Sequence, residues 1–302
     1  MAHRWKCSHW PDRLSNDVKI AAPGPERTGR FSLKDLPMRL LLLLSALTLM
    51  GCAATPDFRS QADVVIVGEV HGVAEHHAYQ AQVAAEIQPS AIVFEQLPGS
   101  QSARLAGLLR SGAGATEISR ALDWQARGWP DFAFYHDIML AAPSAQILGA
   151  EATRAALETA RRDGAAAAFG TGAERYGLTE PLPAVQRATR ELAQVDAHCG
   201  LITAQVAAGF VEAQRYRDAL LAQTVVLARE RTGNGRVLVI TGNGHARVDH
   251  GVPALLAIAD PRIATFAIGQ VAPGDDAPFN DVRIGAIPQA ADPCASLRPS
   301  AS

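Results

Sequence analysis

Short apolar runs alternate with longer stretches of helical periodicity through most of the chain. The runs have the length and the valine and isoleucine content of buried strands, and they occupy residues 64–67, 92–94, 147–148, 237–240 and 263–268. This alternation favours an α/β fold with an open, mostly parallel sheet flanked by helices. A short edge strand is also expected at 282–287. Two largely helical segments, at about 100–141 and 181–231, predict a helical insertion beside the sheet.

The longest predicted helix, at about 204–231, carries four charged side chains on one side. They are Glu212, Arg215, Arg217 and Asp218. Charged positions that gather on one side of a helix are typical of a face that contacts water. We therefore expect this group of charges to lie at the surface of the protein and not in a binding site.

Acidic and imidazole side chains follow the predicted strands at the point where each strand ends. These residues are Glu69, His71, Glu95, Glu151 and His245. Ligands of open parallel sheets bind in the crevice beyond the carboxyl ends of the strands. A polar group at a buried strand end also costs free energy unless it finds a partner. The sequence therefore predicts one crevice into which these side chains converge.

The spacing of these residues allows several kinds of chemistry. Glu69 and His71 are two residues apart, so an extended backbone sends both side chains to the same side, where the carboxylate can orient the imidazole. The glycine-rich turn after the fourth strand adds His245 and Arg247. The set can bind a divalent metal through Glu69, His71 and His245, carry out acid–base chemistry, or hold propionate or phosphate groups through Arg247. Spacing alone leaves these alternatives open.

The amino-terminal part of the chain has the pattern of a lipoprotein signal peptide. Residues 38–51 contain a short positive start, an apolar core of about a dozen residues and a small-residue ending. The ending resembles a bacterial lipobox, which predicts acylation of Cys52 and a tether over 52–62. Residues 1–37 precede a complete signal peptide, and we interpret them as a wrongly assigned start. A disordered extension is the alternative. Residues 63–297 are expected to form one domain, followed by a tail at 298–302.

The charge balance excludes some partners. Eight of the 28 Lys and Arg residues and four of the 30 Asp and Glu residues precede residue 53, which leaves a net charge of about −6 for the rest, against −2 for the whole chain. No basic patch remains, so nucleic acid is not an expected partner. The sequence also lacks a Gly-x-Gly-x-x-Gly motif, a P-loop, a Gly-x-Ser-x-Gly elbow and a His-Glu-x-x-His motif.

Two cysteines remain once Cys7 and the predicted lipidation site are set aside. They are Cys199 and Cys294. In an oxidising periplasm, two thiols left in one domain form a natural disulfide pair. The alternative is two separate buried thiols.

Taken together, these motifs resemble the ChaN-like haem-binding lipoproteins, within the wider Tiki, TraB and erythromycin-esterase group. The resemblance covers residues 61–297. It rests on segments at 67–71, 76–77, 92–98, 128–132, 197–200, 213–218, 242–253 and 292–294. It implies haem binding in iron uptake by a membrane-tethered protein that forms a homodimer. The resemblance of the lipobox to those of other bacterial lipoproteins implies an anchor in the outer membrane that faces the periplasm, and an outer-membrane haem transporter is a further expected partner. The family resemblance also implies that a tyrosine coordinates the iron.

The resemblance does not choose among the tyrosines of the chain. Tyr135 lies just after the Gly-Trp-Pro-Asp motif, Tyr176 lies in a loose loop, and Tyr79 lies one helical turn from His76. For each of them, an ordinary half-buried tyrosine is the alternative. The residues expected to contact a ligand are Glu69, His71, His76, Glu95, Tyr135, Glu151, Tyr176, His245 and Arg247.

The same resemblance supports a second interpretation, which is a hydrolase. Erythromycin esterases carry a similar turn and use its histidine, and the Tiki relatives are proposed metal-dependent peptidases. In such an enzyme Glu69, Glu95 or Glu151 would act as the base, and His71 and His245 as metal ligands or proton carriers. We expect a haem-binding protein first, this hydrolase second, and a scaffold without chemistry third.

Overall fold

The computed structural model describes residues 61–285 and Cys294. The predicted signal peptide, the lipidation site Cys52 and the tail at 298–302 lie outside these residues. Within them, no helix combines the length and the apolar composition that crossing a bilayer requires.

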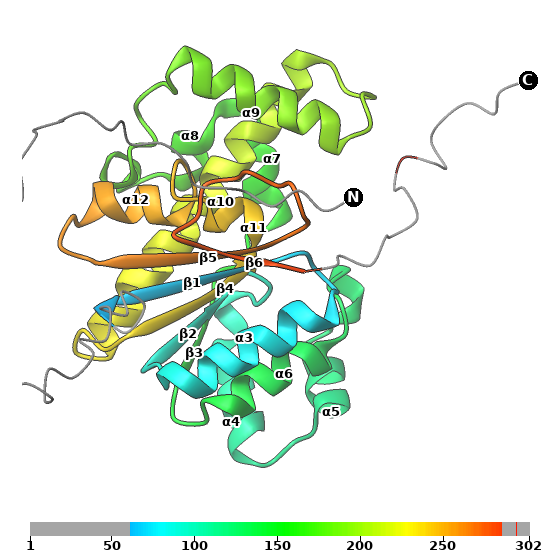
Figure 1. Ribbon diagram of the computed structural model, residues 1–302, viewed down its shortest axis with the longest axis vertical. Helices are drawn as coiled ribbons and strands as arrows, with labels where there is room; N and C mark the ends of the chain where they lie inside the picture. Colours follow the sequence, from blue (N-terminus) through cyan, green and yellow to red (C-terminus); the bar gives the residue numbers. More distant parts are fainter. Residues whose placement is uncertain (1–60, 286–293, 295–302) are drawn as a thin grey trace, which may run out of the picture. The chain divides into compact units, whose positions relative to one another are not determined.

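In the described part of the chain, six parallel strands form one open sheet with the order β3-β2-β4-β1-β5-β6 (Figure 1). The strands are Val64–Glu69 (β1), Ala91–Phe94 (β2), Gln146–Gly149 (β3), Val237–Gly242 (β4), Thr265–Val271 (β5) and Asp281–Ile284 (β6). All residues of β1 and β2 are buried, as expected for strands that are covered on both faces. The predicted parallel α/β fold is confirmed.

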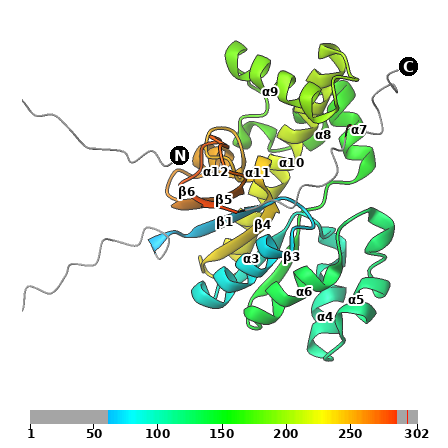
Figure 2. The ribbon, with the colours of Figure 1, turned by 45° about the vertical axis from the view of Figure 1, so that its right-hand side comes forward.

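Helices cover both faces of the sheet (Figures 1 and 2). One layer contains Ala74–Ile87 (α3), Ser102–Arg110 (α4), Ala115–Ala121 (α5) and Phe132–Ala141 (α6). The other layer contains Arg154–Asp163 (α7), Ala165–Phe169 (α8), Ala184–Ala197 (α9), Ala204–Arg231 (α10), Asn243–Ala246 (α11) and Val252–Ala259 (α12). Short 3-10 turns occur at Gly99–Gln101 (η2), Gln125–Arg127 (η3) and Ala173–Tyr176 (η4). Each layer buries its own apolar cluster against the sheet.

The chain leaves β1 and β4 toward opposite layers. These two strands are neighbours, and Glu69 at the end of β1 lies beside Gly242 at the end of β4. The chain continues from β1 into α3 on one face and from β4 into α11 and α12 on the other. Such a switch point opens a crevice at the carboxyl edge of a parallel sheet, and the predicted site residues lie around it.

Two glycines allow the chain to turn tightly at this edge. A Cβ on Gly68 would lie 2.3 Å from Oδ1 of Asn243, so only glycine lets β1 pass this close to the turn after β4. Gly72 has a φ of +82°, in the left-handed region that side chains disfavour. The glycines at both ends, Gly68 and Gly72, therefore allow the backbone of the Gly-Glu-Val-His-Gly turn to adopt its conformation.

The expectation of a solvated charged face on α10 is wrong for two of its four residues. Arg215 is 8% exposed and Asp218 is 1% exposed. Helices α7, α8, α9 and α12 all pack against α10, so the helix has neighbours around most of its circumference. Helical periodicity identified the charged side of α10, but it did not show that other helices cover that side.

The predicted disulfide between Cys199 and Cys294 is confirmed, with the two Cα atoms 5.5 Å apart. The bond joins positions 95 residues apart. In the chain-entropy account, closing a loop of this length stabilises the fold by up to about 4–5 kcal/mol. The disulfide also ties the segment after β6 to the chain just beyond α9.

Candidate functional site

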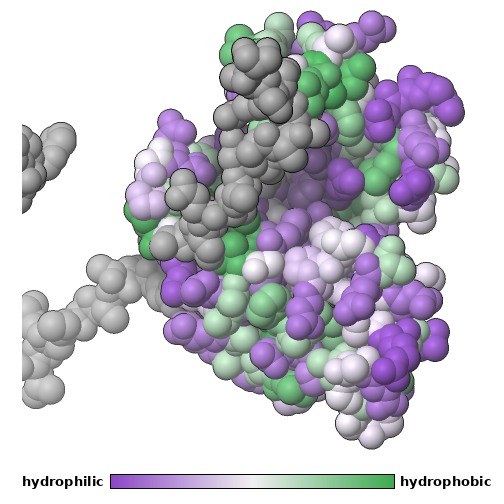
Figure 3. Space-filling model, turned by 90° about the vertical axis from the view of Figure 1, so that its right-hand side faces the viewer, coloured by the Kyte–Doolittle hydropathy of each residue, from purple (hydrophilic) through white to green (hydrophobic). Residues whose placement is uncertain are grey.

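A cavity of about 860 Å³ opens at the carboxyl edge of the sheet, between the two helical layers. Figure 3 faces this edge and shows hydrophilic residues gathered in a hollow. The walls come from the turn after β1, the residues after β2 and β3, the loop after η3, the start of α7, and α10. Among the lining residues are His71, Glu95, Glu151 and His245. The structure therefore brings four of the five predicted strand-end residues to one cavity.

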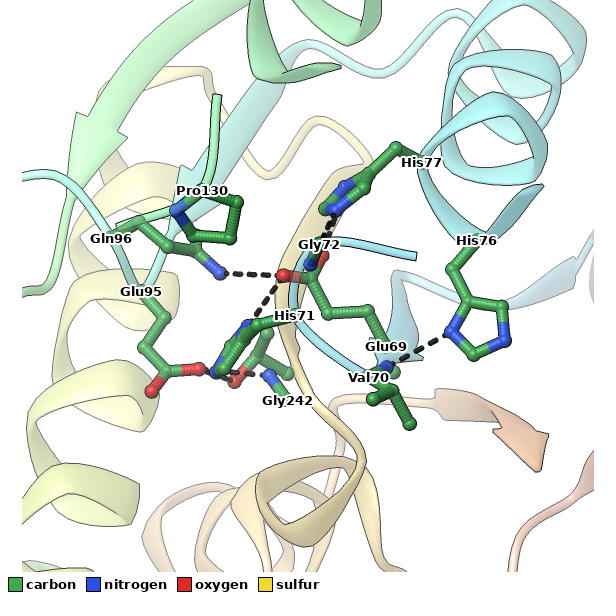
Figure 4. A network of polar contacts seen from close by, with 12 residues as sticks. Glu69, Val70, His71, Gly72, His76, His77, Glu95, Gln96, Pro130 and Gly242 are labelled. Carbon is green, nitrogen blue, oxygen red and sulfur yellow. Dashed lines mark hydrogen bonds and ion pairs between the residues drawn. The ribbon is translucent and has the colours of Figure 1, made fainter. Parts of the chain in front are cut away.

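The fifth residue, Glu69, lies behind the cavity wall with a fully buried carboxylate. Its Oε1 accepts hydrogen bonds from His71 Nδ1 at 2.6 Å and Gln96 Nε2 at 3.2 Å (Figure 4). The same oxygen accepts a hydrogen bond from the Tyr135 hydroxyl at 2.9 Å. Its Oε2 accepts a hydrogen bond from Gln80 Nε2 at 2.7 Å. A carboxylate with this many donors is not free to act as a base or to bind a metal. Glu69 instead positions His71.

His71 presents the other side of its imidazole to the cavity. Because Nδ1 donates to Glu69, Nε2 is the ring nitrogen that remains available, and the side chain is 38% exposed. The edge of the ring packs against Trp129, with centroids 5.2 Å apart. Burial lowers the pKa of His71, but the hydrogen bond to Glu69 and the carboxylate of Glu95 outweigh burial and raise the pKa overall.

His76 and His77 support the turn from behind. The Val70 N–H donates to Nδ1 of His76 at 2.9 Å, and the Gly72 N–H donates to Nε2 of His77 at 3.2 Å (Figure 4). A nitrogen that accepts a hydrogen bond carries no proton. Burial lowers the pKa of both histidines, which agrees with two neutral rings. His76, predicted to contact a ligand, therefore holds the backbone of the turn.

Four side chains of alternating charge, Glu95, His245, Asp218 and Arg190, form a row on the side of the site away from Glu69. Glu95 accepts hydrogen bonds from the Thr241 hydroxyl at 2.7 Å and the Gly242 N–H at 2.8 Å. Its other oxygen lies 3.5 Å from Nε2 of His245, whose Nδ1 bonds to Asp218 at 2.6 Å. Asp218 in turn lies 3.6 Å from the Arg190 guanidinium. The row joins the end of β2 to α9 through α10 and the turn after β4.

Within this row, the charged forms of Glu95 and His245 are favoured. Burial lowers the pKa of His245, but the carboxylates of Glu95 and Asp218 together raise it above its usual value. Burial likewise raises the pKa of Glu95, whereas His245, His71 and its hydrogen bonds lower the pKa overall. Glu95 therefore lies between two imidazoles that hold protons more tightly than usual, and it remains a carboxylate.

The third predicted carboxylate has a cationic partner. Glu151 forms a close ion pair with Arg127, which also donates to the Gln96 carbonyl at 3.1 Å. Burial raises the pKa of Glu151, and Arg127 opposes the shift. Two nitrogens of Arg127, Nε and Nη2, are buried and have no hydrogen-bond partner within the described residues. Arg154 and Arg217 add two further guanidinium groups to the cavity wall.

Three predicted ligand residues lie elsewhere or are already engaged. Tyr176 is 3% exposed and packs against Phe169 in the apolar core. Tyr135 is fully buried, and burial together with the Glu69 carboxylate raises its pKa. Arg247 pairs with Asp249 and lines a smaller recess beside the main cavity. The structure therefore does not bring a tyrosine hydroxyl to the cavity.

Several residues of the site were missed by sequence reasoning. Arg127, Trp129, Asp218 and Arg190 all lie in helices or loops away from the strand ends. Asp218 and Arg190 are buried, and no local pattern distinguishes them from surface charges. A metal centre is also not indicated, because no group of three His, Cys, Asp or Glu side chains in 61–285 is arranged to hold an ion.

Replacing Asp218 with Asn should lower the pKa of His245. The change removes one of the two carboxylates that stabilise the imidazolium, whereas the Asn oxygen can still accept the hydrogen bond from Nδ1. NMR titration of the His245 ring protons measures this pKa. Asp249→Asn is the matched control, because Asp249 contacts Arg247 and His250 rather than His245.

The free energy of unfolding should also depend on the Asp218→Asn substitution, in a way that varies with pH. Because folding raises the pKa of His245, the imidazolium contributes stability that is complete below about pH 6.5 and is lost as the pH rises through the folded pKa. The difference in unfolding free energy between the unchanged chain and Asp218→Asn should therefore be larger at pH 6 than at pH 9. An unaltered pKa of His245 in Asp218→Asn would contradict the charge row.

Comparisons with solved structures agree with this fold. The chain is similar to a structure of cofacial haem binding to ChaN of Campylobacter jejuni, with 17% identity, a TM-score of 0.55, and coverage of 71% of this chain and 84% of that chain. It also matches the type III effector HopBA1 (12% identity, TM-score 0.39, 70% and 79% covered) and the erythromycin esterase EreC (14% identity, TM-score 0.40, 71% and 71% covered). No curated protein matches the chain.

The family follows from the sequence. A family profile described as haem-binding uptake, Tiki superfamily, ChaN matches residues 58–256, which is more than half of the chain. Every residue that lines the main cavity falls inside this range. The predicted resemblance is confirmed, and the chain belongs to the ChaN family of the Tiki superfamily.

Proposed function

We propose that this protein binds haem in the cavity at the carboxyl edge of its sheet. The observation that carries the proposal is the position of the cavity, which lies wholly within the part of the chain that matches a haem-binding uptake family. In this proposal haem is the cargo that the protein takes up, and it is not a resident catalytic group. The protein would deliver or store it in iron acquisition.

The lining of the cavity suits a flat, largely apolar and doubly anionic molecule. Its volume of about 860 Å³ is within the usual range of about 300–1,000 Å³ for small-molecule sites. Pro98, Trp129 and Leu157 supply apolar surface, and Arg154 and Arg217 supply positive charge for carboxylates.

His71 is the best-placed group to coordinate the iron. Its Nδ1 donates to a buried carboxylate and its Nε2 is available, which is the usual arrangement of an imidazole that binds a metal. Tyr135, by contrast, would have to give up its hydrogen bond to Glu69 and lose its proton against a raised pKa. A tyrosine ligand from within 61–285 would therefore require a rearrangement, whereas His71 does not.

Titration of the purified chain with hemin tests the function and the ligand together. We expect a shifted Soret band with a saturable end point. His71→Ala should weaken binding at least tenfold and change the spectrum, because it removes the coordinating nitrogen, whereas Tyr135→Phe should leave the spectrum unchanged. A tyrosinate charge-transfer band that disappears in Tyr135→Phe would contradict histidine coordination. A folded chain that gives no Soret shift at all would contradict haem binding.

We further propose that the protein is an outer-membrane lipoprotein that faces the periplasm, anchored by acylated Cys52. The lipobox-like ending of residues 38–51 supports this location. A homodimer is implied by the family resemblance, and an outer-membrane haem transporter is a further expected partner. Size-exclusion chromatography with and without hemin tests the dimer.

Expression in a bacterial host with labelled palmitate tests the anchor. The unchanged chain should incorporate the label and fractionate with the outer membrane, because the acyl chains partition into lipid. Cys52→Ser should lose the label and leave the membrane fraction. Cys7→Ser is the control and should behave like the unchanged chain, since residues 1–37 are not expected in the mature protein. Labelling that persists in Cys52→Ser would contradict the proposal.

A hydrolase remains the second candidate because the Glu95–His245–Asp218 row has the form of a proton-transfer group. If the site is catalytic, Glu95→Gln should lower kcat by about 10²–10⁴-fold on any ester or peptide that the unchanged chain cleaves. Asp163→Asn, an exposed change next to Arg162, should not alter kcat. A panel of chromogenic esters and peptides provides the measurement. No turnover above the uncatalysed rate would exclude this candidate for the substrates tested.

A further inference from the structure

A second, smaller recess lies on the far side of His245 from the main cavity. Its volume is about 220 Å³, and it is enclosed by α9, α10 and the turn after β4. Gln214 and His245 line both spaces, so the two spaces adjoin. The recess is therefore a distinct site that borders the haem cavity, and neither the family match nor the sequence motifs assign it a role.

Arg190 is the buried arginine in the lining of this recess. The residue is 9% exposed, and its closest carboxylate oxygen belongs to Asp218 at 3.6 Å. This separation is too long for a hydrogen bond. Among residues 61–285, nothing else accepts a hydrogen bond from the Arg190 guanidinium. Burial lowers the pKa of Arg190, with the Asp218 charge opposing the shift. The N–H donors of Arg190 therefore have no hydrogen-bond partner within 61–285, and the side chain lines the recess.

Arg215, a buried arginine on the neighbouring helix, shows what a structural arginine looks like in this protein. It is 8% exposed, and it donates to both carboxylate oxygens of Glu212 and to the carbonyls of Gly177, Leu178 and Glu180. Both terminal nitrogens of its guanidinium are used. The difference between the two arginines indicates that Arg190 is arranged for a partner that is not part of its own fold.

The other charges around the recess are already matched. Arg247 donates to both oxygens of Asp249 at 3.0 and 2.8 Å, and His250 also contacts Asp249 at 3.1 Å. Asp218 accepts a short hydrogen bond from His245. Within 61–285, the Arg190 guanidinium thus lines the recess without donating a hydrogen bond. The recess therefore offers a positively charged donor to a ligand.

We propose that this recess binds a small organic carboxylate, seated on the guanidinium of Arg190. The planar fork of arginine matches the two oxygens of a carboxylate. The volume holds about seven water-sized groups, at roughly 30 Å³ each, so the ligand is a short acid. Ala193 and Gly244 offer an apolar surface to its carbon chain, which favours an organic acid over a hydrated inorganic anion.

The carboxylate can come from two sources. One is a free short-chain acid. The other is a carboxylate arm of the ligand in the main cavity, which shares the lining residues Gln214 and His245 with the recess. The first source is independent of the proposed haem function. The second source depends on it. The experiment therefore has one arm for each source.

In the first arm, sodium butyrate is titrated into the purified full chain at constant ionic strength, with sodium chloride as the reference salt. Butyrate should bind saturably and shift the NMR signals of the His245 ring. Arg190→Gln should weaken binding at least tenfold. Gly244→Leu should also weaken it, because a side chain there enters space where a Cβ meets no atom within 4 Å. Arg187→Gln is the matched control, an exposed arginine on the same helix, and should change affinity less than twofold.

In the second arm, hemin is compared with its dimethyl ester in the unchanged chain and in Arg190→Gln. If a carboxylate arm of haem occupies the recess, esterification should cost at least tenfold in affinity in the unchanged chain and less than twofold in Arg190→Gln. Binding in either arm with this dependence on Arg190 supports the proposal. Butyrate binding without haem binding would support the recess while overturning the haem function. The proposal is overturned if butyrate behaves like chloride and esterification costs the same with and without Arg190.

Discussion

The buried carboxylate of Glu69 is the interaction on which the site depends. A carboxylate without solvent is stable only if hydrogen bonds replace the water it loses. Here the donors come from the turn after β1, from α3, from the residue after Glu95 and from α6. One side chain thus joins the end of β1 to helices α3 and α6. Removing such a partner from a buried network typically costs about 3–5 kcal/mol.

The same interaction determines what the cavity contains. Because Glu69 holds Nδ1 of His71, the imidazole can offer only Nε2, and the ring is held against Trp129. A similar pair occurs on the other side of the sheet, where Asp218 on α10 forms a hydrogen bond with Nδ1 of His245. Each imidazole is therefore oriented by its own buried carboxylate, Glu69 at the end of β1 or Asp218 on α10, and Glu95 lies between the two. The crevice at the switch point is the place where these two independent supports meet.

Much of this arrangement could be predicted from local sequence. Parallel strands place their carboxyl ends at one edge, so residues that directly follow apolar runs, such as Glu95 and His245, were predicted to converge. The partners that hold them could not be predicted in the same way. Asp218 lies 27 residues from His245 in the middle of a long helix, and which side of that helix is covered depends on the packing of other helices.

The tyrosines show a second limit of the sequence. Tyr135 and Tyr176 were expected near a ligand because of a motif and a loose loop, respectively. Both are buried, the first against Glu69 and the second in the apolar core. An aromatic side chain with one polar atom is compatible with core, cavity or surface, and only long-range packing chooses among them. The sequence alone therefore identified the edge of the sheet where the site lies but not every side chain that faces it.

The distribution of unsatisfied groups shows which ligands the folded protein favours. The carboxylates around the cavity, Glu69, Glu95, Glu151 and Asp218, all have donors or cations within the protein. Arg127, in contrast, keeps two buried nitrogens without hydrogen-bond partners in the described part of the chain, and Arg190 faces the smaller recess with no carboxylate oxygen closer than 3.6 Å. A divalent cation would have to break existing bonds to reach carboxylate oxygens, whereas an anionic ligand would complete bonds that the protein leaves open. The two spaces at this edge are therefore better suited to carboxylates than to bare metal ions.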